Sequence, residues 1–209
     1  MNTKKMQDLK KISIAFIGFS IVCIILFSLL FFSSFGIVNA QWITHDQIES
    51  FSVGNADGEI KDTLFVYIQN NNLFSDEVSR LLEKKLQSHS FSIQMLEQVN
   101  ETTNIDNTSF LGITISEITT HYTPWSAEIK YSIFYYFSDI GNTMYFPILI
   151  DEESSSTRPA IIFNATQGAQ FLNVGDIVVE ASIDGFLSKP KMQQIFYDAI
   201  AESIYNQLI

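Results

Sequence analysis

A single cysteine, Cys23, stands in this chain of 209 residues, so no disulfide can form within one chain. The sequence also lacks the motifs of common catalytic sites: it has no Gly-x-Ser-x-Gly elbow, no Gly-x-Gly-x-x-Gly turn and no phosphate-binding loop ending in Gly-Lys-Ser/Thr. His45, His89 and His121 are isolated, because no second histidine or cysteine lies at zinc-ligand spacing. We therefore predict no catalytic, cofactor-binding or metal-binding residue, and no enzymatic activity.

Basic residues are also scarce, and they are unevenly placed. The chain has 12 Lys and Arg against 23 Asp and Glu, a net charge of −11. Four lysines fall within the first eleven residues, so residues 41–209 carry 8 basic and 22 acidic side chains, a net charge of −14. Because so acidic a surface repels phosphate backbones, we predict that the protein does not bind nucleic acid.

An uncharged apolar run extends from Ile12 to Phe32, 21 residues interrupted only by serine and glycine. Wound as a helix it spans roughly 30 Å, about the thickness of the hydrocarbon core of a bilayer. Lysines precede the run and acids dominate the chain beyond it, so the positive-inside rule places the N-terminus in the cytoplasm. We predict a basic cytoplasmic tail at residues 1–11 and a transmembrane signal anchor at 12–35. Trp42 then lies where an interfacial aromatic residue could sit.

Cleavage of this segment as a signal peptide is the alternative. Val38-Asn39-Ala40 places small residues at the two positions that signal peptidase inspects, and cleavage after Ala40 would leave Gln41 first. The apolar part of a signal peptide usually runs for ~7–15 residues, and the longer run here favours an uncleaved anchor. In both cases the rest of the chain lies outside the cytoplasmic membrane.

Residues 36–61 are interpreted as a stalk, and residues 62–209 as an α+β domain. An apolar strand at 63–68, a helix from Ser75 to Leu86 and a strand at 91–95 read as a βαβ unit with parallel strands. Alternating apolar residues then predict a strand at 111–115, a hairpin over 129–150 and a strand at 176–184. Residues 160–163 are either a further strand or a bridge.

The last predicted helix begins after Ser188, which can cap it, and has Pro190 in its first turn. It carries a wide apolar stripe, as does the helix ending at Leu86. Two such helices covering one face of a single sheet would bury both stripes. The predicted fold is therefore a two-layer sandwich, with one mixed, mostly antiparallel sheet and both amphipathic helices on one face.

This order of elements resembles small envelope domains of β-α-β-β-β-α type, such as the lipopolysaccharide-assembly lipoprotein that plugs an outer-membrane translocon. The resemblance covers roughly residues 62–208 and depends on element order and on Gly175-Asp176, which opens the last strand. It implies a non-catalytic domain that binds a partner at an envelope surface. Those relatives are lipidated at a cysteine and this chain is not, so no functional residue is carried over.

Two groups of acidic residues lack the geometry of a catalytic or metal site. Neighbours among Asp176, Glu180 and Asp184 stand roughly 13 Å apart along one strand face, too far to share one ion or one scissile bond. The run Asp151 to Glu153 lacks the glycine and the alternating oxygen ligands of a calcium loop. Both groups are interpreted as solvated surface.

Three N-glycosylation sequons lie beyond the predicted membrane span, at Asn100, Asn107 and Asn164, and none has proline in its middle position. Two lie in a polar connector and one near a predicted loop, where a glycan fits. In a host that has the oligosaccharyl transferase, we predict that at least one of them is occupied.

The predicted function is that of a single-pass membrane protein whose outer domain binds or scaffolds an envelope protein partner without catalysis or cofactor. Tyr136 and Tyr145 face away from the main apolar sides of their strands, so they either pack in the core or line a partner surface. The alternative function is an anchored or secreted surface hydrolase with scattered catalytic residues. A pocket in which His121 meets a carboxylate would favour it.

Overall fold

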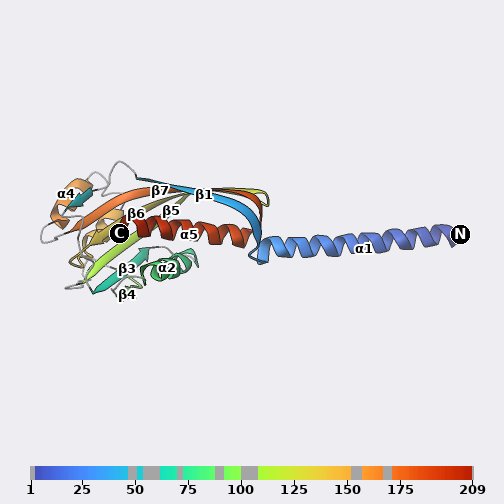
Figure 1. The fold of residues 1–209 in the computed structure, drawn as a ribbon, viewed down its shortest axis with the longest axis horizontal. Coiled ribbons are helices and arrows are strands. Elements are labelled where there is room, and N and C mark those ends of the chain that lie inside the picture. The colour runs from blue at the N-terminus through green and yellow to red at the C-terminus, as the bar shows by residue number, and fades with distance from the viewer. Residues whose placement is uncertain are drawn as a thin grey trace.

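The helix α1 (Thr3–Phe32) projects from one end of an α+β domain in the computed structural model of the chain (Figure 1). The structure describes residues 3–46, 51–53, 62–69, 73–87, 92–99, 108–151, 157–166 and 171–208, with the backbone alone for 3–15, 45–46, 51–53, 73–75, 117–118 and 208. Among these residues, no helix combines the length and the apolar character needed to cross a membrane. The membrane span at 12–35 stays a prediction.

A seven-stranded sheet forms the centre of the domain, in the order β1-β7-β6-β5-β3-β4, with β2 also paired to β7. The strands are β1 (Gly36–Asp46), β2 (Phe51–Val53), β3 (Thr63–Gln69), β4 (Ser92–Met95), β5 (Ser109–Thr123), β6 (Ser126–Ser138) and β7 (Leu172–Leu187). The helices after α1 are α2 (Leu73–Leu86), α3 (Tyr145–Ile150), α4 (Arg158–Ala165) and α5 (Lys189–Leu208). Strand β3 is parallel to β4 and β5, and the other pairs are antiparallel. The predicted mixed sheet and the βαβ unit β3-α2-β4 are confirmed.

The helices α2 and α5 cover one face of the sheet, as the two apolar stripes predict. Buried Val78, Leu82 and Leu86 of α2 and Met192, Phe196 and Ile200 of α5 share one apolar core with alternate residues of β3, β5, β6 and β7. At the margin of this core, Nζ of Lys85 in α2 donates to Oε2 of Glu202 in α5 over 2.6 Å, which forms an ion pair between the two helices. This layer is the main core of the domain.

A second, smaller core lies on the opposite face, so the domain is not a two-layer sandwich throughout. The short helices α3 and α4 pack there over the ends of β5, β6 and β7 that lie far from α1, and α4 marks that end in Figure 1. Its buried members are Phe110, Phe134, Tyr136, Phe146, Leu149, Ala165, Leu172 and Val174. Three layers are therefore present at the end of the domain distant from α1.

Both helices of this smaller core were predicted differently. Residues 144–150 do not complete a hairpin with 129–138; α3 begins at Tyr145, and β6 pairs instead with β5 through the turn at Pro124 and Trp125. Phe146 and Leu149, three residues apart, are both buried, as one side of a helix requires. Pro147 needs no ladder partner in the first turn of a helix. Residues 160–163 likewise lie in α4, which Arg158-Pro159 opens.

The predicted stalk at residues 36–61 is wrong for its first part. Residues 36–46 form β1, which pairs with β7 over its whole length, from Gly36 opposite Leu187 to Asp46 opposite Ile177. Val38 and Ala40 pack against the main core, because they alternate with the outward Asn39 and Gln41. The residues after α1 therefore belong to the folded domain.

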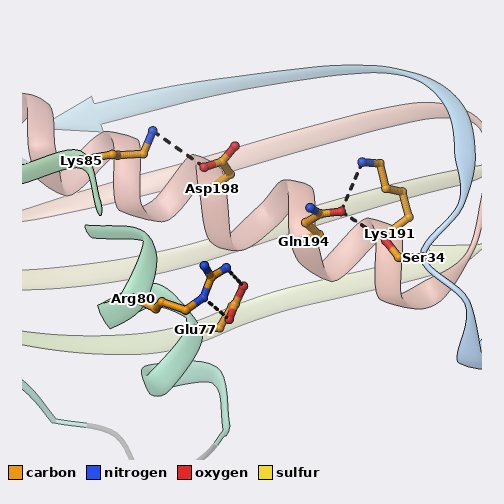
Figure 2. A network of polar contacts seen from close by, with 7 residues as sticks. All are labelled: Ser34, Glu77, Arg80, Lys85, Lys191, Gln194 and Asp198. Atoms are coloured by element: carbon orange, nitrogen blue, oxygen red, sulfur yellow. Dashed lines mark hydrogen bonds and ion pairs between the residues drawn. The ribbon is translucent and has the colours of Figure 1, made fainter. Parts of the chain in front are cut away.

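Only residues 33–35 separate α1 from β1, and hydrogen bonds fix them to the start of α5. The backbone N–H of Phe35 donates to Oγ of Ser188 over 3.0 Å, and the N–H of Ser188 donates to the carbonyl of Phe35 over 2.9 Å. Ser34 and Lys191 both donate to the Gln194 side chain over 3.2 Å (Figure 2). Oγ of Ser188 also accepts from the N–H of Lys191, which confirms the predicted cap.

The first testable prediction concerns Gly112, on which the ring of Phe146 rests. A Cβ at this position would lie 2.4 Å from Cδ2 of Phe146, a fully buried side chain that would have to move. Overpacking of this kind costs about 1–3 kcal/mol. We expect Gly112→Ala to lower the urea midpoint of the full-length protein in detergent micelles. The control Gly18→Ala, whose Cβ would meet no atom within 4 Å apart from its chain neighbours and the backbone of its own helix, should not lower it. Equal midpoints would contradict the packing of α3 on β5.

Candidate functional site

Among the residues that the structure describes, no helix covers the sheet face opposite α2 and α5 between the smaller core and α1. We call this surface the open face. Its members are outward side chains of β1, β7, β6 and β5: Asn39, Gln41, Ile43, Thr119, His121, Ser126, Glu128, Lys130, Glu180, Ser182 and Asp184. A shallow hollow of about 460 Å³ lies on it, lined in part by Gln41, Thr119, Glu128, Lys130, Glu180 and Ser182. The open face is the candidate functional site.

Cross-strand register brings these residues together in rows. One row runs from Gln41 through Ser182 and Glu128 to His121, and the next runs from Ile43 through Glu180 and Lys130 to Thr119. A β-bulge between Glu117 and Thr119 shifts the pairing of β5 with β6. This extra residue reverses the side-chain alternation of β5, so Thr119 and His121 point to the open face although Ile113 and Ile115 point to the main core.

The carboxylates of β7 lie on one face, as the alternation predicts, but two of them are paired. Glu180 accepts from Lys130 of β6 over 2.5 Å, with both side chains more than two-fifths exposed. Asp176 lies 3.1 Å from Nη1 of Arg158 of α4, and these side chains are only 15% and 25% exposed. Asp184 is exposed. Asp176 is therefore a largely shielded structural partner and not part of a solvated row.

Arg158 marks the border between the smaller core and the open face. Besides its pair with Asp176, its Nε donates to the carbonyl of Leu149 over 3.2 Å. Its guanidinium carbon lies 4.9 Å from the centroid of the Phe134 ring, in the arrangement of a cation–π contact. One side chain thus joins α4, α3, β6 and β7, and the helical cover of this face ends beside it.

The arrangement of His121, Glu128 and Ser182 does not match a serine hydrolase. A catalytic triad needs the histidine between the nucleophile and the carboxylate. Here Glu128 stands between Ser182 and His121 in the cross-strand row, and all three side chains are exposed. Within the described ranges, no three His, Cys, Asp or Glu side chains gather as metal ligands. The open face offers hydrogen bonds and charge, without a geometry for acyl transfer.

The other predicted site residues are scattered. Asn164 is exposed in the last turn of α4, and Thr166 of the same sequon donates to the carbonyl of Phe163 over 2.7 Å. Ala40 lies in the middle of β1. Asp151 is exposed and the side chain of His45 is not described. The remaining positions lie outside the described residues: Asn100, Asn107, His89, Glu152 and Glu153.

Tyr136 and Tyr145 do not form the partner surface that was one of the two alternatives from the sequence. Tyr136 is fully buried in the smaller core, where burial raises the pKa of its phenol, and Tyr145 packs half-buried against the same core. Tyr136 points away from the main core, as the strand alternation predicts, whereas Tyr145 lies in helix α3 and not in the predicted strand. Packing on the second face, and not a partner surface, explains both residues.

A second hollow, of about 490 Å³, lies beside α2 and β4. Its lining includes Asp76, Arg80, Glu83 and Glu97. Arg80 donates two hydrogen bonds to Glu77 (Figure 2), which lower the pKa of that carboxyl. On the same helix, the hydrogen bond to Glu202 raises the pKa of Lys85. These contacts explain the charges of α2 as part of the helical layer.

No protein-family model and no curated protein matches this chain. Among solved structures, the chain is similar to a minor lipoprotein from Acinetobacter baumannii, with 11% sequence identity and a TM-score of 0.38. The similarity covers 72% of this chain and 94% of that one. A likeness this distant transfers no property of that lipoprotein, and the resemblance to envelope domains stays a prediction.

The second testable prediction compares two ion pairs on the same strand face. Asp176→Asn removes the charge facing the half-buried Arg158, and a hydrogen bond to a charged group contributes about 1.5–3 kcal/mol. Glu180→Gln breaks the exposed pair with Lys130, which is worth about 0–1 kcal/mol. We expect only Asp176→Asn to lower the urea midpoint clearly. An equal loss in both variants would show that Arg158 does not hold α4 on the sheet.

Proposed function

We propose that the protein is a membrane-anchored binding or scaffold module of the cell envelope, with its N-terminus in the cytoplasm and its α+β domain outside. The observation that carries the binding role is the open face, a broad polar surface on the side of the sheet opposite α2 and α5. It is shallow, and it mixes amide, hydroxyl and charged groups of both signs. Such a surface suits a flat polar partner better than a small molecule, which is usually held in an apolar pocket.

The net charge of the open face indicates which kind of partner would bind to it. Glu128, Glu180 and Asp184 face one basic side chain, Lys130, so the surface keeps two formal negative charges when His121 is neutral. A partner protein that presents basic side chains and hydrogen-bond donors would complement it. The net negative charge of residues 41–209 would also attract a basic partner at longer range.

The anchor is proposed from the amino-acid sequence, where the uncharged run from Ile12 to Phe32 counts 21 residues. That length matches the hydrocarbon thickness of a bilayer, and the lysines before it favour a cytoplasmic N-terminus. α1 is helical throughout this run and leads into β1 through only three residues.

The junction supports an uncleaved chain. Cleavage after Ala40 would remove the first five residues of β1, which pair with residues 183–187 of β7. It would also remove Phe35 and Ser34, which bond to Ser188 and Gln194. The loss of this much edge strand and junction would remove the bonds of residues 34 and 35 to the start of α5 and expose the β1 side of the end of β7. We therefore propose that the anchor is retained.

A surface hydrolase remains the second candidate because of one pair of carboxylates. Glu128 and Glu180 are diagonal neighbours on β6 and β7, and such neighbours stand roughly 7–8 Å apart. This is a separation between backbone positions, and carboxyl groups carried on it could reach the range of about 6.5–9.5 Å found between the carboxyl groups of inverting glycosidases. Glu180 is paired with Lys130, however, and Glu128 is exposed, whereas a general acid needs burial to raise its pKa.

The third testable prediction concerns orientation. Translated with glycosylating microsomes, the chain should retain residues 1–40 and gain glycosidase-sensitive mass, because the sequons at Asn100, Asn107 and Asn164 would enter the lumen. The triple variant with glutamine at these positions is the control and should gain none. If the domain stayed unglycosylated and protease added outside the microsomes digested it, the orientation would be the reverse of the one proposed. A mature chain beginning at Gln41 would show that the anchor is cleaved.

The fourth testable prediction concerns the open face. A photo-crosslinking phenylalanine analogue at Ser182 should capture one defined protein in intact cells, and Glu128→Lys in the same chain should abolish that product because it reverses a charge at the centre of the face. The analogue at Asn206, exposed on α5, is the matched control and should capture nothing. Turnover of a glycoside by the purified chain, lost in Glu128→Gln, would support the hydrolase instead.

A further inference from the structure

Exposed apolar side chains gather at the end of the domain that meets α1. Ile37 of β1 is 91% exposed, Trp125 in the β5–β6 turn is 67% exposed, and Phe32 at the end of α1 is 79% exposed. Phe35 and Phe186, both partly exposed, lie with them. We call these five residues the proximal rim. Among the described residues past α1, Ile37 and Trp125 are the most exposed large hydrophobic side chains.

The rim is built by three segments that are distant in sequence. Ile37 stands opposite Phe186 in the pairing of β1 with β7. The Phe186 ring contacts Trp125 and Phe35, with centroid distances of 4.8 and 5.5 Å. Backbone hydrogen bonds of 3.0 Å from Gly185 to the carbonyl of Trp125 and from Leu187 to that of Pro124 fix the turn against β7.

Gly185 makes this close arrangement sterically feasible. Its φ of 120° disfavours any side chain, and a Cβ there would lie 2.4 Å from the carbonyl oxygen of Ile37. β1, β7 and the β5–β6 turn can therefore meet at one place. The rim is a fixed surface, and its outward apolar area needs a cover other than water.

The position of the rim indicates a lipid surface as that cover. Phe32 ends the apolar run of α1, and residues 33–35 lead directly to Ile37. A bilayer that surrounds the run would therefore have its headgroup layer at the level of the rim. Tryptophan is enriched at that level, because its ring is apolar and its N–H is polar.

The charges beside the rim fit the same cover. Only eight basic side chains occur in residues 41–209, and two of them, Lys189 and Lys191, stand at the start of α5 next to the end of α1. Lys191 shares the Gln194 side chain with Ser34 of the junction (Figure 2). Lysines at this level attract anionic phosphates. Asp184, two pairs further along β7 from the rim, is the nearest carboxylate on the open face.

We propose that the proximal rim inserts into the outer headgroup layer of the membrane, with Lys189 and Lys191 against lipid phosphates. This inference rests on the proposed membrane anchor and adds a second contact with the bilayer. α5 and the long strands β1 and β7 extend in nearly the same direction as α1 (Figure 1). The domain then stands upright on the membrane, and the open face points sideways toward a partner in the same envelope layer.

The two tryptophans of the chain provide the test. Trp42→Phe leaves Trp125 alone, and the matched control Trp125→Phe leaves Trp42, five residues beyond Ile37 on β1 and on the side of the main core. Five residues of strand place Trp42 roughly 17 Å farther from the bilayer. The full-length variants are reconstituted in vesicles of phosphatidylcholine and phosphatidylglycerol. Emission is then quenched by lipids brominated near the top of the acyl chain, or by iodide in the buffer.

We expect the emission of Trp125 to lie at shorter wavelength than that of Trp42, to be quenched by brominated lipid and to resist quenching by iodide. The emission of Trp42 should be quenched by iodide and not by brominated lipid. Flotation after an alkaline wash reports the anchor separately. Vesicle-bound protein whose Trp125 stays open to iodide would overturn the inference and leave the anchor standing. Failure to float would overturn both. Shielding of Trp125 from iodide without quenching by lipid would overturn the lipid contact and assign the rim to a second copy or another protein.

Discussion

The pairing of β1 with β7 is the constraint on which the rest of the structure depends. It turns the eleven residues after the α1 junction into an edge strand and brings Gly36 against Leu187, where α5 begins two residues later. The reciprocal backbone bonds of Phe35 and Ser188 close the same corner. Because β1 leaves α1 almost at once, any restraint on the helix is transmitted to the sheet without a flexible stalk.

This constraint links features that look independent. The proposed retention of the anchor, the arrangement of the proximal rim and the direction of the open face all depend on how residues 33–40 are held. A tethered domain on a long linker could turn in any direction, and a face on it would meet partners at random angles. A domain fixed at its base presents one face in one direction, which reduces the orientational cost of association with another protein in the same membrane.

Periodicity and capping residues within one segment predict the elements whose structure depends mainly on that segment. The alternation in β7, the stripe and cap of α5, and the β3-α2-β4 unit were read from residues within one element. The sequence does not predict β1, because the polar Asn39 and Gln41 suggest a linker. Only the pairing with β7 shows that they are the outward residues of an edge strand. The sequence predicts a strand at α3 because Phe146 and Ile148 alternate, whereas packing buries Phe146 over Gly112 together with Leu149, which lies on the same side of a helix. The open face and the rim depend on a β-bulge and on long-range register, which no local pattern encodes.

The sequence of β7 also explains why the open face stays open. Its outward residues are Leu172 and Val174, then Asp176 and the buried Val178, and farther along Glu180, Ser182 and Asp184. A helix can cover the first two by apolar contact, and α3 and α4 do so. At Asp176 continued cover requires a charged partner, which Arg158 provides. Beyond that point a helix would have to desolvate further carboxylates and Lys130, which costs more than its apolar contacts would return. The smaller core therefore ends at Arg158, and the surface left over is one whose polar groups are best satisfied by water or by a polar partner.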